Sequence, residues 1–250
     1  MSVTAAAGQV IMHPVLSKSL KIWATTLGRD KTYRAIQYFA RFYAYILLRR
    51  GDKDAAQRWN ALKNHLGLGR KLMRLGKPLE HLQAALKASQ SVALSQQSAE
   101  RFTAVARQLC YAGYLTFDAI VWANSVKFIS LIPTKAESAL KISLRFWLVG
   151  IMVGQFNSLL KVGRLANEAK ALKAPGEKSM GDRAESDTRL KALERERAAV
   201  RYQLLLDVLD MWIPATGLGI VNFNDGVVGF LGFATSVMAF KSQWNSIQMG

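Results

Sequence analysis

The sequence predicts an all-α fold in which N-terminal amphipathic helices are followed by long apolar helices and a C-terminal apolar segment. Half of the residues are hydrophobic, so the chain is too apolar to be disordered. Only five prolines interrupt it, apolar residues recur at helical spacing, and alternating strand patterns are few. The chain carries 34 Lys and Arg against 17 Asp and Glu, a formal charge of +17, together with six Trp. A basic chain with long apolar runs favours an anionic membrane surface over nucleic acid.

The first two helices are expected on either side of a glycine. A helix over 14–26 has its proline in the first turn, where proline is tolerated, and Gly28 is expected to end it. Asp30 can then cap a second helix over 31–50, which Gly51 closes. Either a soluble bundle or lipid could cover the broad apolar side of this second helix. Its polar stripe comprises Arg34, Gln37, Arg41 and Arg49.

Four further helices are expected between residues 55 and 172. Asp54 can cap a helix over 55–76, and Pro78 marks the turn that follows. The next helices are expected over 79–89, 99–132 and 136–172. A Ser/Gln-rich loop follows the first of these, and Pro133 ends the second. Residues 173–187 are polar with Pro and Gly, which predicts a flexible linker.

The C-terminal part is expected to hold a helix over 188–213, interrupted by Pro214, and a final apolar helix over 226–240. The predicted organisation is therefore an N-terminal amphipathic region, a pair of long helices, the linker, and a C-terminal region with an apolar membrane segment. These regions span 1–98, 99–172, 173–187 and 188–250.

Two candidate membrane spans lie in the long helices, since crossing a bilayer takes about 20 mostly apolar residues. Residues 109–132 are long enough but contain Asp118 and Lys127, and each charge costs about 2.5–3.5 kcal/mol at mid-membrane. We expect these two side chains to be intramembrane polar groups, or to line an aqueous path. The other candidate, 142–165, has no charge over 146–160.

Two further features bear on the candidate spans: a pair of glycines in 142–165 and the short length of 226–240. Gly150 and Gly154 are four positions apart, a spacing that lets helices approach closely, so we expect both to serve helix packing. The segment 226–240 is short and would need the residues before it to complete a span. The core of a helical bundle is the alternative for all three segments.

The stretch QRWNALKNHLGLGRKLMRLGKP (57–78) separates basic from apolar residues around a helix. The basic side comprises Lys63, Arg70, Lys71 and Arg74. The apolar arc comprises Trp59, Leu62, Leu66, Leu68, Leu72, Met73 and Leu75. One sign of charge beside Leu and Trp is typical of a helix that lies among lipid headgroups, whereas a soluble surface helix carries both signs. A basic helix that faces a groove in a bundle is the alternative. The expected lipid-binding residues are Trp59, Leu62, Lys63, Leu66, Arg70, Lys71, Met73 and Arg74.

Three sequence blocks resemble the peroxin-eleven family of peroxisome proliferation factors. They are TTLGRDKTYRAIQYFARFYAYIL (25–47), GLGRKLMRLGKPLEHLQAAL (67–86) and RQLCYAGYLTFDAIVWAN (107–124). With a C-terminal GLG…G segment, the similarity covers most of the chain. The resemblance implies a peroxisomal membrane protein that promotes membrane elongation before fission, with a membrane-active helix over 57–76. It also implies self-association, and work with a dynamin-related GTPase and its tail-anchored adaptor. Some members of the family are proposed to form pores for small metabolites.

Patterns of catalytic chemistry are lacking in the sequence. His13, His65 and His81 do not have the spacing of metal ligands, and the lone Cys110 reads as a small buried hydrophobe. No phosphate-binding Walker loop or nucleophile elbow occurs. We therefore expect no enzyme activity, no cofactor and no metal site.

Three functions follow as hypotheses. The first is remodelling of the peroxisomal membrane by insertion of the amphipathic helix into one leaflet, with anionic lipids and further copies of the chain as partners. The second is a pore for small metabolites in the same membrane. The third is a soluble basic protein that binds nucleic acid, which would be released by alkaline carbonate extraction.

Overall fold

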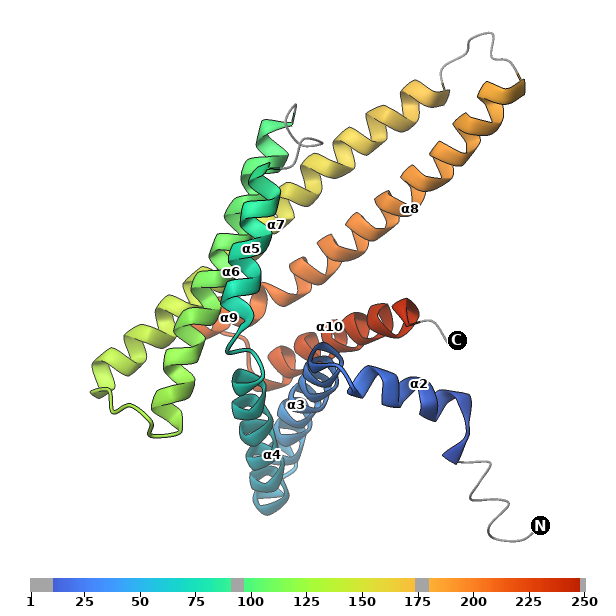
Figure 1. Cartoon of the computed structure of the whole chain (residues 1–250). Coiled ribbons are helices and arrows are strands. Elements are labelled where there is room, and N and C mark those ends of the chain that lie inside the picture. The colour runs from blue at the N-terminus through green and yellow to red at the C-terminus, as the bar shows by residue number, and fades with distance from the viewer. Residues whose placement is uncertain (1–10, 91–96, 174–179, 248–250) are drawn as a thin grey trace, which may run out of the picture. The chain divides into compact units, whose positions relative to one another are not determined.

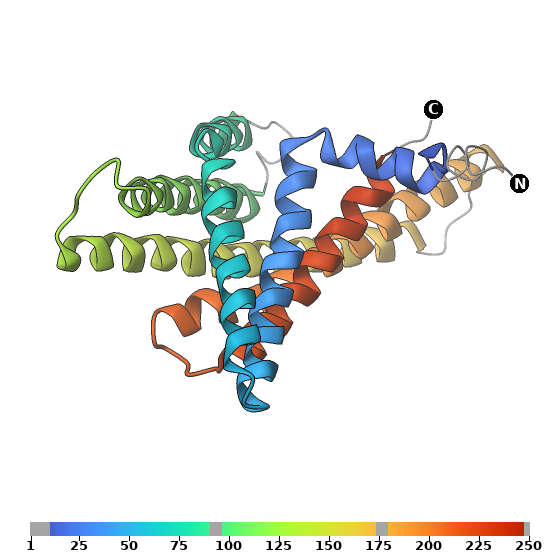
Figure 2. The ribbon, with the colours of Figure 1, turned by 90° about the horizontal axis from the view of Figure 1, so that it is seen from below.

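The computed structural model describes residues 11–90, 97–173 and 180–247, except for the side chains of 180–184. Every regular element within these ranges is an α-helix, which confirms the all-α prediction (Figures 1 and 2). The chain forms two compact units: residues 1–75 with 221–250, and residues 76–220. The first unit thus combines the two ends of the chain, which the sequence-based division had kept apart.

The first unit is built around α3 (Thr26–Arg49), which contacts each of the other helices of that unit. These are α2 (Pro14–Trp23), α4 (Lys53–Leu72) and α10 (Asp225–Ser246). Figure 2 shows α4 and α10 along different sides of α3. The chain therefore reaches α4 by a short turn from α3 and reaches α10 only after passing through the second unit.

The start of α3 corrects two expectations. Thr25 is the N-cap, and its hydroxyl oxygen accepts a hydrogen bond from the backbone N–H of Gly28 at 3.0 Å. Gly28 therefore lies in the first turn of α3 and does not end α2, and Asp30 does not act as a cap. A Cβ at Gly28 would overlap the carbonyl oxygen of Ile22, so glycine is needed where the end of α2 turns back. Gly51, at φ +87°, closes α3 as predicted.

The start of α4 and the start of α5 (Lys77–Gln90) also differ from the expectation. Asp52, not Asp54, caps α4, because its carboxylate accepts the backbone N–H of Ala55 at 3.0 Å. Pro78 lies in the first turn of α5, where a missing N–H costs nothing, so it does not mark the turn.

A row of glycines on α10 brings this helix close to α3. A Cβ at any of the three would run into an aromatic residue of α3, and at Gly229 it would lie 2.5 Å from a backbone nitrogen. The matched positions are Gly226 with Tyr45, Gly229 with Phe42, and Gly232 with Tyr38. Small residues of this kind let two backbones approach without needing a polar contact. The N- and C-terminal parts of the chain are joined along this contact.

The second unit is a stack in which α6 and α7 are the central helices. Its helices after α5 are α6 (Ser98–Ser125), α7 (Pro133–Lys173), α8 (Met180–Asp210) and the short α9 (Trp212–Gly217). The helix α6 packs between α5 and α7, and α7 also contacts α8 and α9. Leu165 and Ala169 of α7 form an apolar cluster with Leu193 of α8, which joins the paired ends of α7 and α8 seen in Figure 1.

The end of α6 corrects the helix predicted over 99–132. The side-chain oxygen of Asn124 accepts the backbone N–H of Leu131 at 3.0 Å, and Lys127 adopts a left-handed conformation at φ 61°. Both features turn the chain, so α6 ends at Ser125. The candidate span 109–132 is therefore not a continuous helix.

The segment predicted as a linker, 173–187, is partly helical. Lys173 belongs to α7 and residues from Met180 onward belong to α8, while 174–179 lie outside the described residues. Several residues in 180–187 are good helix formers, and packing of Leu190 and Leu193 against α7 holds the helix that they start.

Replacing Gly229 by Ala should destabilise the first unit by about 1–3 kcal/mol, because its Cβ meets the backbone of Phe42. Thermal unfolding followed by circular dichroism in detergent measures this loss. Gly69→Ala is the matched control, since nothing lies within 4 Å of a Cβ there, and it should be neutral or stabilising by up to about 1 kcal/mol. Equal melting of the two variants would contradict close packing of α10 on α3.

Candidate membrane-binding surface

The helix α4 packs on α3 with its polar side. Ala56 and Arg70 are buried there, and a Cβ at Gly67 would lie 3.0 Å from the amide nitrogen of Gln37. Lys63 and Arg74 share this side by helical spacing and are half-buried. The basic side expected to face lipid phosphates is thus turned largely toward α3.

A buried ion pair holds this arrangement. The Arg70 guanidinium donates from Nε to Oδ1 of Asp30 at 2.9 Å and from Nη1 to Oε1 of Gln37 at 2.7 Å. The side chains of Arg70 and Asp30 are only 8% and 13% exposed. Arg34 is also buried, and its guanidinium lies 5.3 Å from the ring centroid of Tyr38. Arg70 was predicted to bind lipid, and the structure places its charge inside the protein, paired with Asp30.

The pKa values of the pair follow from burial and from neighbouring charges. Burial alone would raise the pKa of Asp30, but the charges of Arg70 and Arg74 outweigh it and hold this pKa below its usual value. Burial lowers the pKa of Arg70, and the nearby cations Arg74 and Arg34 lower it further, while Asp30 opposes both effects. Asp30 is therefore the acidic group that makes a buried Arg70 tolerable.

Aromatic residues close one edge of the α3–α4 contact. The ring of Trp59 meets Phe39 and Tyr43 of α3 edge-on, with centroid distances of 5.8 and 5.0 Å. Trp59 was predicted to bind lipid, and the structure places much of its ring against α3 while leaving it partly exposed. Such edge-on pairs contribute about 0.5–1.5 kcal/mol beyond their buried area.

The opposite side of α4 presents leucines to the exterior. Leu62 and Leu72 are 38% and 52% exposed, and Leu75, in the turn after the helix, is 39% exposed. Leu66, Met73 and Lys71 are intermediate between buried and exposed. Lys63 donates to the side-chain oxygen of Asn60 at 2.8 Å, and Arg74 donates to the carbonyl oxygen of Arg70 at 3.2 Å. The exterior of α4 thus carries leucines beside the exposed Arg58, Asn64 and His65, while Trp59 shares the α3 side with Arg70.

The helix α7 of the second unit also exposes large apolar side chains. Among the residues that the structure describes, it is the one helix long and apolar enough to cross a membrane, although a buried core helix can pass the same test of length and composition. Large apolar side chains are exposed along one stripe: Phe146, Val149, Met152, Phe156 and Leu159. The buried residues of α7 combine small, polar and apolar side chains: Ala139, Ser143, Gly150, Ile151, Gly154, Asn157, Ser158, Leu165 and Ala169. Lipid would satisfy the outer stripe as water cannot.

The predicted packing glycines of α7 lie against α6. A Cβ at Gly150 would lie 3.1 Å from Cβ of Cys110, and a Cβ at Gly154 would lie 2.6 Å from the guanidinium of Arg107. The two predicted intramembrane charges are separated by the end of α6. Asp118 is buried within that helix, whereas Lys127 lies in the exposed turn after it.

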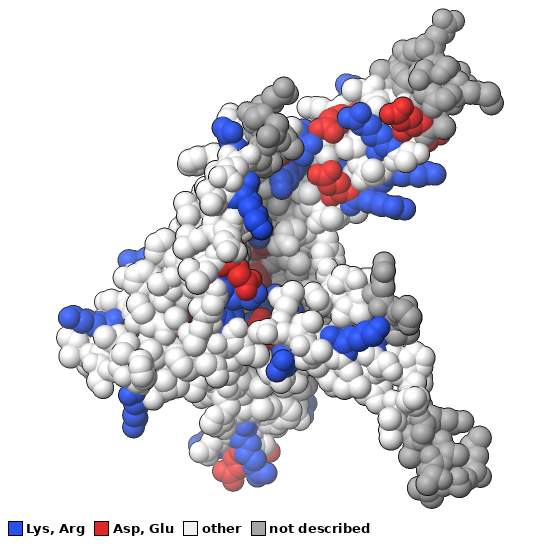
Figure 3. Space-filling view, in the orientation of Figure 1, with Lys and Arg blue, Asp and Glu red and all other residues white. Residues whose placement is uncertain are grey.

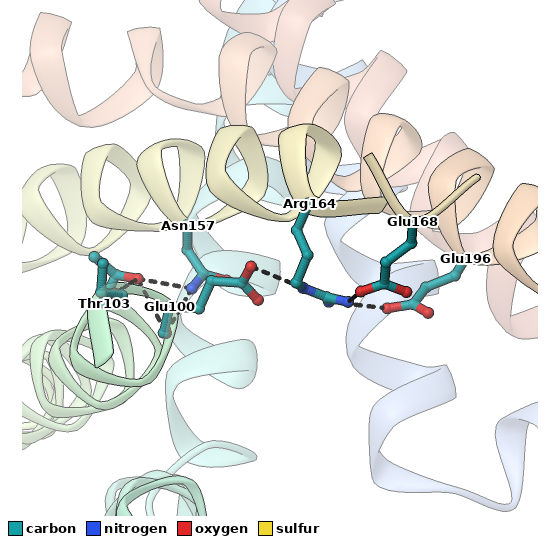
Figure 4. A network of polar contacts seen from close by, with 7 residues as sticks. Glu100, Thr103, Asn157, Arg164, Glu168 and Glu196 are labelled. Carbon is teal, nitrogen blue, oxygen red and sulfur yellow. Dashed lines mark hydrogen bonds and ion pairs between the residues drawn. The ribbon is translucent and has the colours of Figure 1, made fainter. Parts of the chain in front are cut away.

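A network of polar contacts joins α6, α7 and α8 (Figure 4). The side-chain amide of Asn157 donates to the carbonyl oxygen of Glu100 at 2.8 Å and to the hydroxyl oxygen of Thr103 at 2.7 Å. Arg164 lies between three carboxylates, those of Glu100, Glu168 and Glu196, at 2.9, 2.6 and 3.7 Å. Sequence reasoning missed this network, although charges inside otherwise apolar helices were a signal for it.

A second ion pair joins α6 to α8, one turn after Thr103 on α6. Arg107 donates to Oδ1 of Asp207 at 3.0 Å, and Gln203 donates to the same oxygen at 2.8 Å. Burial raises the pKa of Asp207, while the charge of Arg107 opposes that shift. In Figure 3 the visible acidic and basic side chains mingle over the paired ends of α7 and α8, whereas large parts of the remaining visible surface are uncharged. Within the described residues, no three His, Cys, Asp or Glu side chains gather as metal ligands.

Comparisons with known proteins agree over nearly the whole chain. The model of the family described as Peroxisomal biogenesis factor 11 (PEX11) matches residues 16–244. Peroxisomal membrane protein PMP30A of Candida boidinii is 28% identical over 255 residues, which cover 96% of this chain and 98% of that protein. Peroxisomal biogenesis factor 11 of Schizosaccharomyces pombe is 26% identical over 245 residues, covering 94% and 97%. Peroxisomal membrane protein 11A of Rattus norvegicus is 29% identical over 226 residues, covering 84% and 89%. No solved structure matches the chain.

Replacing Asp30 by Asn should lower the free energy of unfolding by about 3–5 kcal/mol, because it leaves Arg70 buried without a carboxylate. Chemical denaturation in detergent measures this change. Asp225→Asn is the matched control, since Asp225 pairs with Arg41 at 2.6 Å but its side chain is 51% exposed, and we expect a loss below about 1 kcal/mol. A similar loss in both variants would show that the buried Asp30–Arg70 pair contributes no more to stability than an exposed pair.

Acid should weaken the α3–α4 contact in a defined range. Because the folded pKa of Asp30 lies below its unfolded value, its contribution to stability is complete above about pH 4 and is lost as the pH falls through the folded value. Melting temperatures measured from pH 6 to pH 3 should therefore fall more steeply for the unaltered chain than for Asp30→Asn. Parallel curves would contradict a lowered pKa at Asp30.

Proposed function

Because the chain belongs to the Peroxisomal biogenesis factor 11 (PEX11) family, we propose that it elongates the peroxisomal membrane by placing the leucine face of α4 in one leaflet. It is a peroxisomal membrane protein of a family implicated in peroxisome proliferation. The proposal adds a mechanism to this assignment. The observation that supports it most directly is the outward direction of Leu62 and Leu72 while Arg70 is fixed inside.

Insertion of a fixed helix would act as a wedge. The outer leucines would bury apolar area between acyl chains, at about 25 cal/mol per Å² removed from water. Area added to one leaflet alone favours curvature of the bilayer. Because the Asp30–Arg70 pair and the Trp59 contacts tie α4 to α3, the wedge would not detach from the protein that carries it.

Cationic side chains at the edges of the leucine face would complete the contact. Arg58 is exposed and Lys71 is partly exposed, and long basic side chains can reach phosphates while their stems lie on apolar surface. Each such charge near an anionic membrane contributes about 1 kcal/mol. The set of cations proposed to contact phosphates thus differs from the one expected from the sequence, because Arg70 is paired inside the protein.

The helix α7 would anchor the second unit. The uncharged residues 146–160 span about 22 Å at 1.5 Å per residue, between Arg145 and Lys161. This is shorter than the hydrocarbon core of about 30 Å, so the two flanking cations would extend to the headgroups at either side.

Association with other proteins is part of the proposal. Several copies of the chain would add their wedges along one tubule, and a dynamin-related GTPase with its tail-anchored adaptor would act on the elongated membrane. The resemblance of the sequence to its family supports these partners, and the paired ends of α7 and α8 offer them a charged, exposed surface.

Changing Leu62, Leu72 and Leu75 together to Gln should abolish tubules in proteoliposomes of the full chain made with anionic lipid, because the wedge loses its apolar face. Electron microscopy counts the tubules, and circular dichroism checks the helices. The matched control changes the same three leucines to Ile, which keeps the face apolar and should retain tubules. Tubules of unchanged number in the Gln variant would remove the proposal.

A further inference from the structure

A cavity of about 280 Å³ lies in the second unit, between α7 and the chain that follows α9. All of its lining residues belong to the second unit, whereas α4 belongs to the first. Its lining combines two cationic side chains with four aliphatic ones: Lys141, Arg145, Leu148, Val149, Leu218 and Ile220. Sites for small amphiphilic ligands have this composition, a mostly apolar wall with a few polar groups placed together.

Two glycines shape the wall that α9 contributes. A Cβ at Gly217 would lie 2.9 Å from Leu144, so glycine lets the end of α9 lie close to α7. Gly219 adopts φ +75°, a conformation that favours glycine, and it turns the chain between Leu218 and Ile220. The two glycines therefore place Leu218 and Ile220 beside α7, where they form one wall of this open pocket.

The two cations occupy one end of the apolar stretch of α7. Lys141 forms an ion pair with Glu137 at 2.6 Å, which leaves its side chain about half exposed. Arg145, one turn further, is exposed and is the last charge before the uncharged residues 146–160. If α7 spans the membrane, the cavity lies at the boundary between headgroups and acyl chains, where a phosphate would meet Arg145.

The apolar wall continues along the helix. Val149 lines the cavity and is also the second residue of the exposed stripe of α7. Met152, Phe156 and Leu159 extend this stripe away from the cations. A ligand with an anionic head and an aliphatic chain would therefore find its head and its chain matched along one continuous surface.

We propose that this cavity binds the phosphate head of an anionic phospholipid of the surrounding membrane, with an acyl chain lying on the exposed stripe of α7. The charge of the cavity, its place at the end of the uncharged stretch and its continuity with that stripe each favour a membrane lipid. The site does not depend on the curvature attributed to α4.

Native mass spectrometry of the full chain in detergent, titrated with dioleoyl phosphatidic acid, tests this site. Changing Lys141 and Arg145 together to Gln should weaken binding roughly thirtyfold, since two charges near the phosphate are lost. Leu218→Trp should also weaken binding, because it fills the cavity without altering charge. Circular dichroism confirms that both variants fold.

The matched control is a second pair of exposed lysines on α7, Lys135 and Lys170, changed together to Gln. Neither lines the cavity, so binding of the lipid should change by less than about threefold. Equal weakening in this control, or unchanged binding in the Lys141 and Arg145 variant, would overturn the site. Displacement of the lipid by glycerol 3-phosphate at equal concentration would show that the cavity takes a free phosphate ester, and would overturn a phospholipid ligand.

Discussion

The ion pair between Asp30 and Arg70 decides how the first unit presents itself to its surroundings. Burying an arginine is costly unless a carboxylate and further acceptors satisfy it, and here Asp30 and Gln37 do so. Once Arg70 is fixed against α3, the helical period of α4 places Leu72 on the far side and Leu62 nearer its edge, and both are exposed. Arg70, which the sequence alone suggested as a contact to lipid headgroups, therefore orients the leucines of α4 instead. The buried Arg70 thus helps to determine which leucines of α4 are exposed.

The second unit follows the same constraint with different residues. Arg164 is held by Glu100, and Arg107 is held by Asp207, so charged groups of α6, α7 and α8 meet inside the unit. Ile151 and Leu165 of α7 are buried, while one stripe of large apolar side chains on the same helix remains exposed. Buried ion pairs inside both units, together with large apolar side chains left exposed on α4 and α7, agree with the membrane location of the family.

Helical periodicity was enough to predict the all-α class, most of α7 and the closure of α3 at Gly51, because spacing and a left-handed glycine are local signals. It failed at Gly28 and Asp30, whose roles depend on residues elsewhere: the end of α2 in one case and Arg70 of α4 in the other. A helical wheel placed Trp59 opposite the basic residues, whereas the structure packs both Trp59 and Arg70 on α3, because a wheel cannot say which side of α4 meets a neighbour. The acidic group on α3 facing a helix stretch without acids was the available signal for that pairing. Contacts such as Glu100 with Arg164 lie 64 residues apart, so no local pattern could predict them.

The position of the leucine face relative to lipid is the claim on which the account rests. It is tested most directly with single cysteines introduced at Leu72 and at Asn60 in a chain whose Cys110 is replaced by Ala, each labelled with an environment-sensitive fluorophore and reconstituted into anionic liposomes. A lipid that carries a nitroxide on its acyl chain should quench the label strongly at position 72, on the exposed side of α4, and weakly at position 60, which is only partly exposed beside Lys63. Equal quenching at the two positions, or stronger quenching at position 60, would contradict the account.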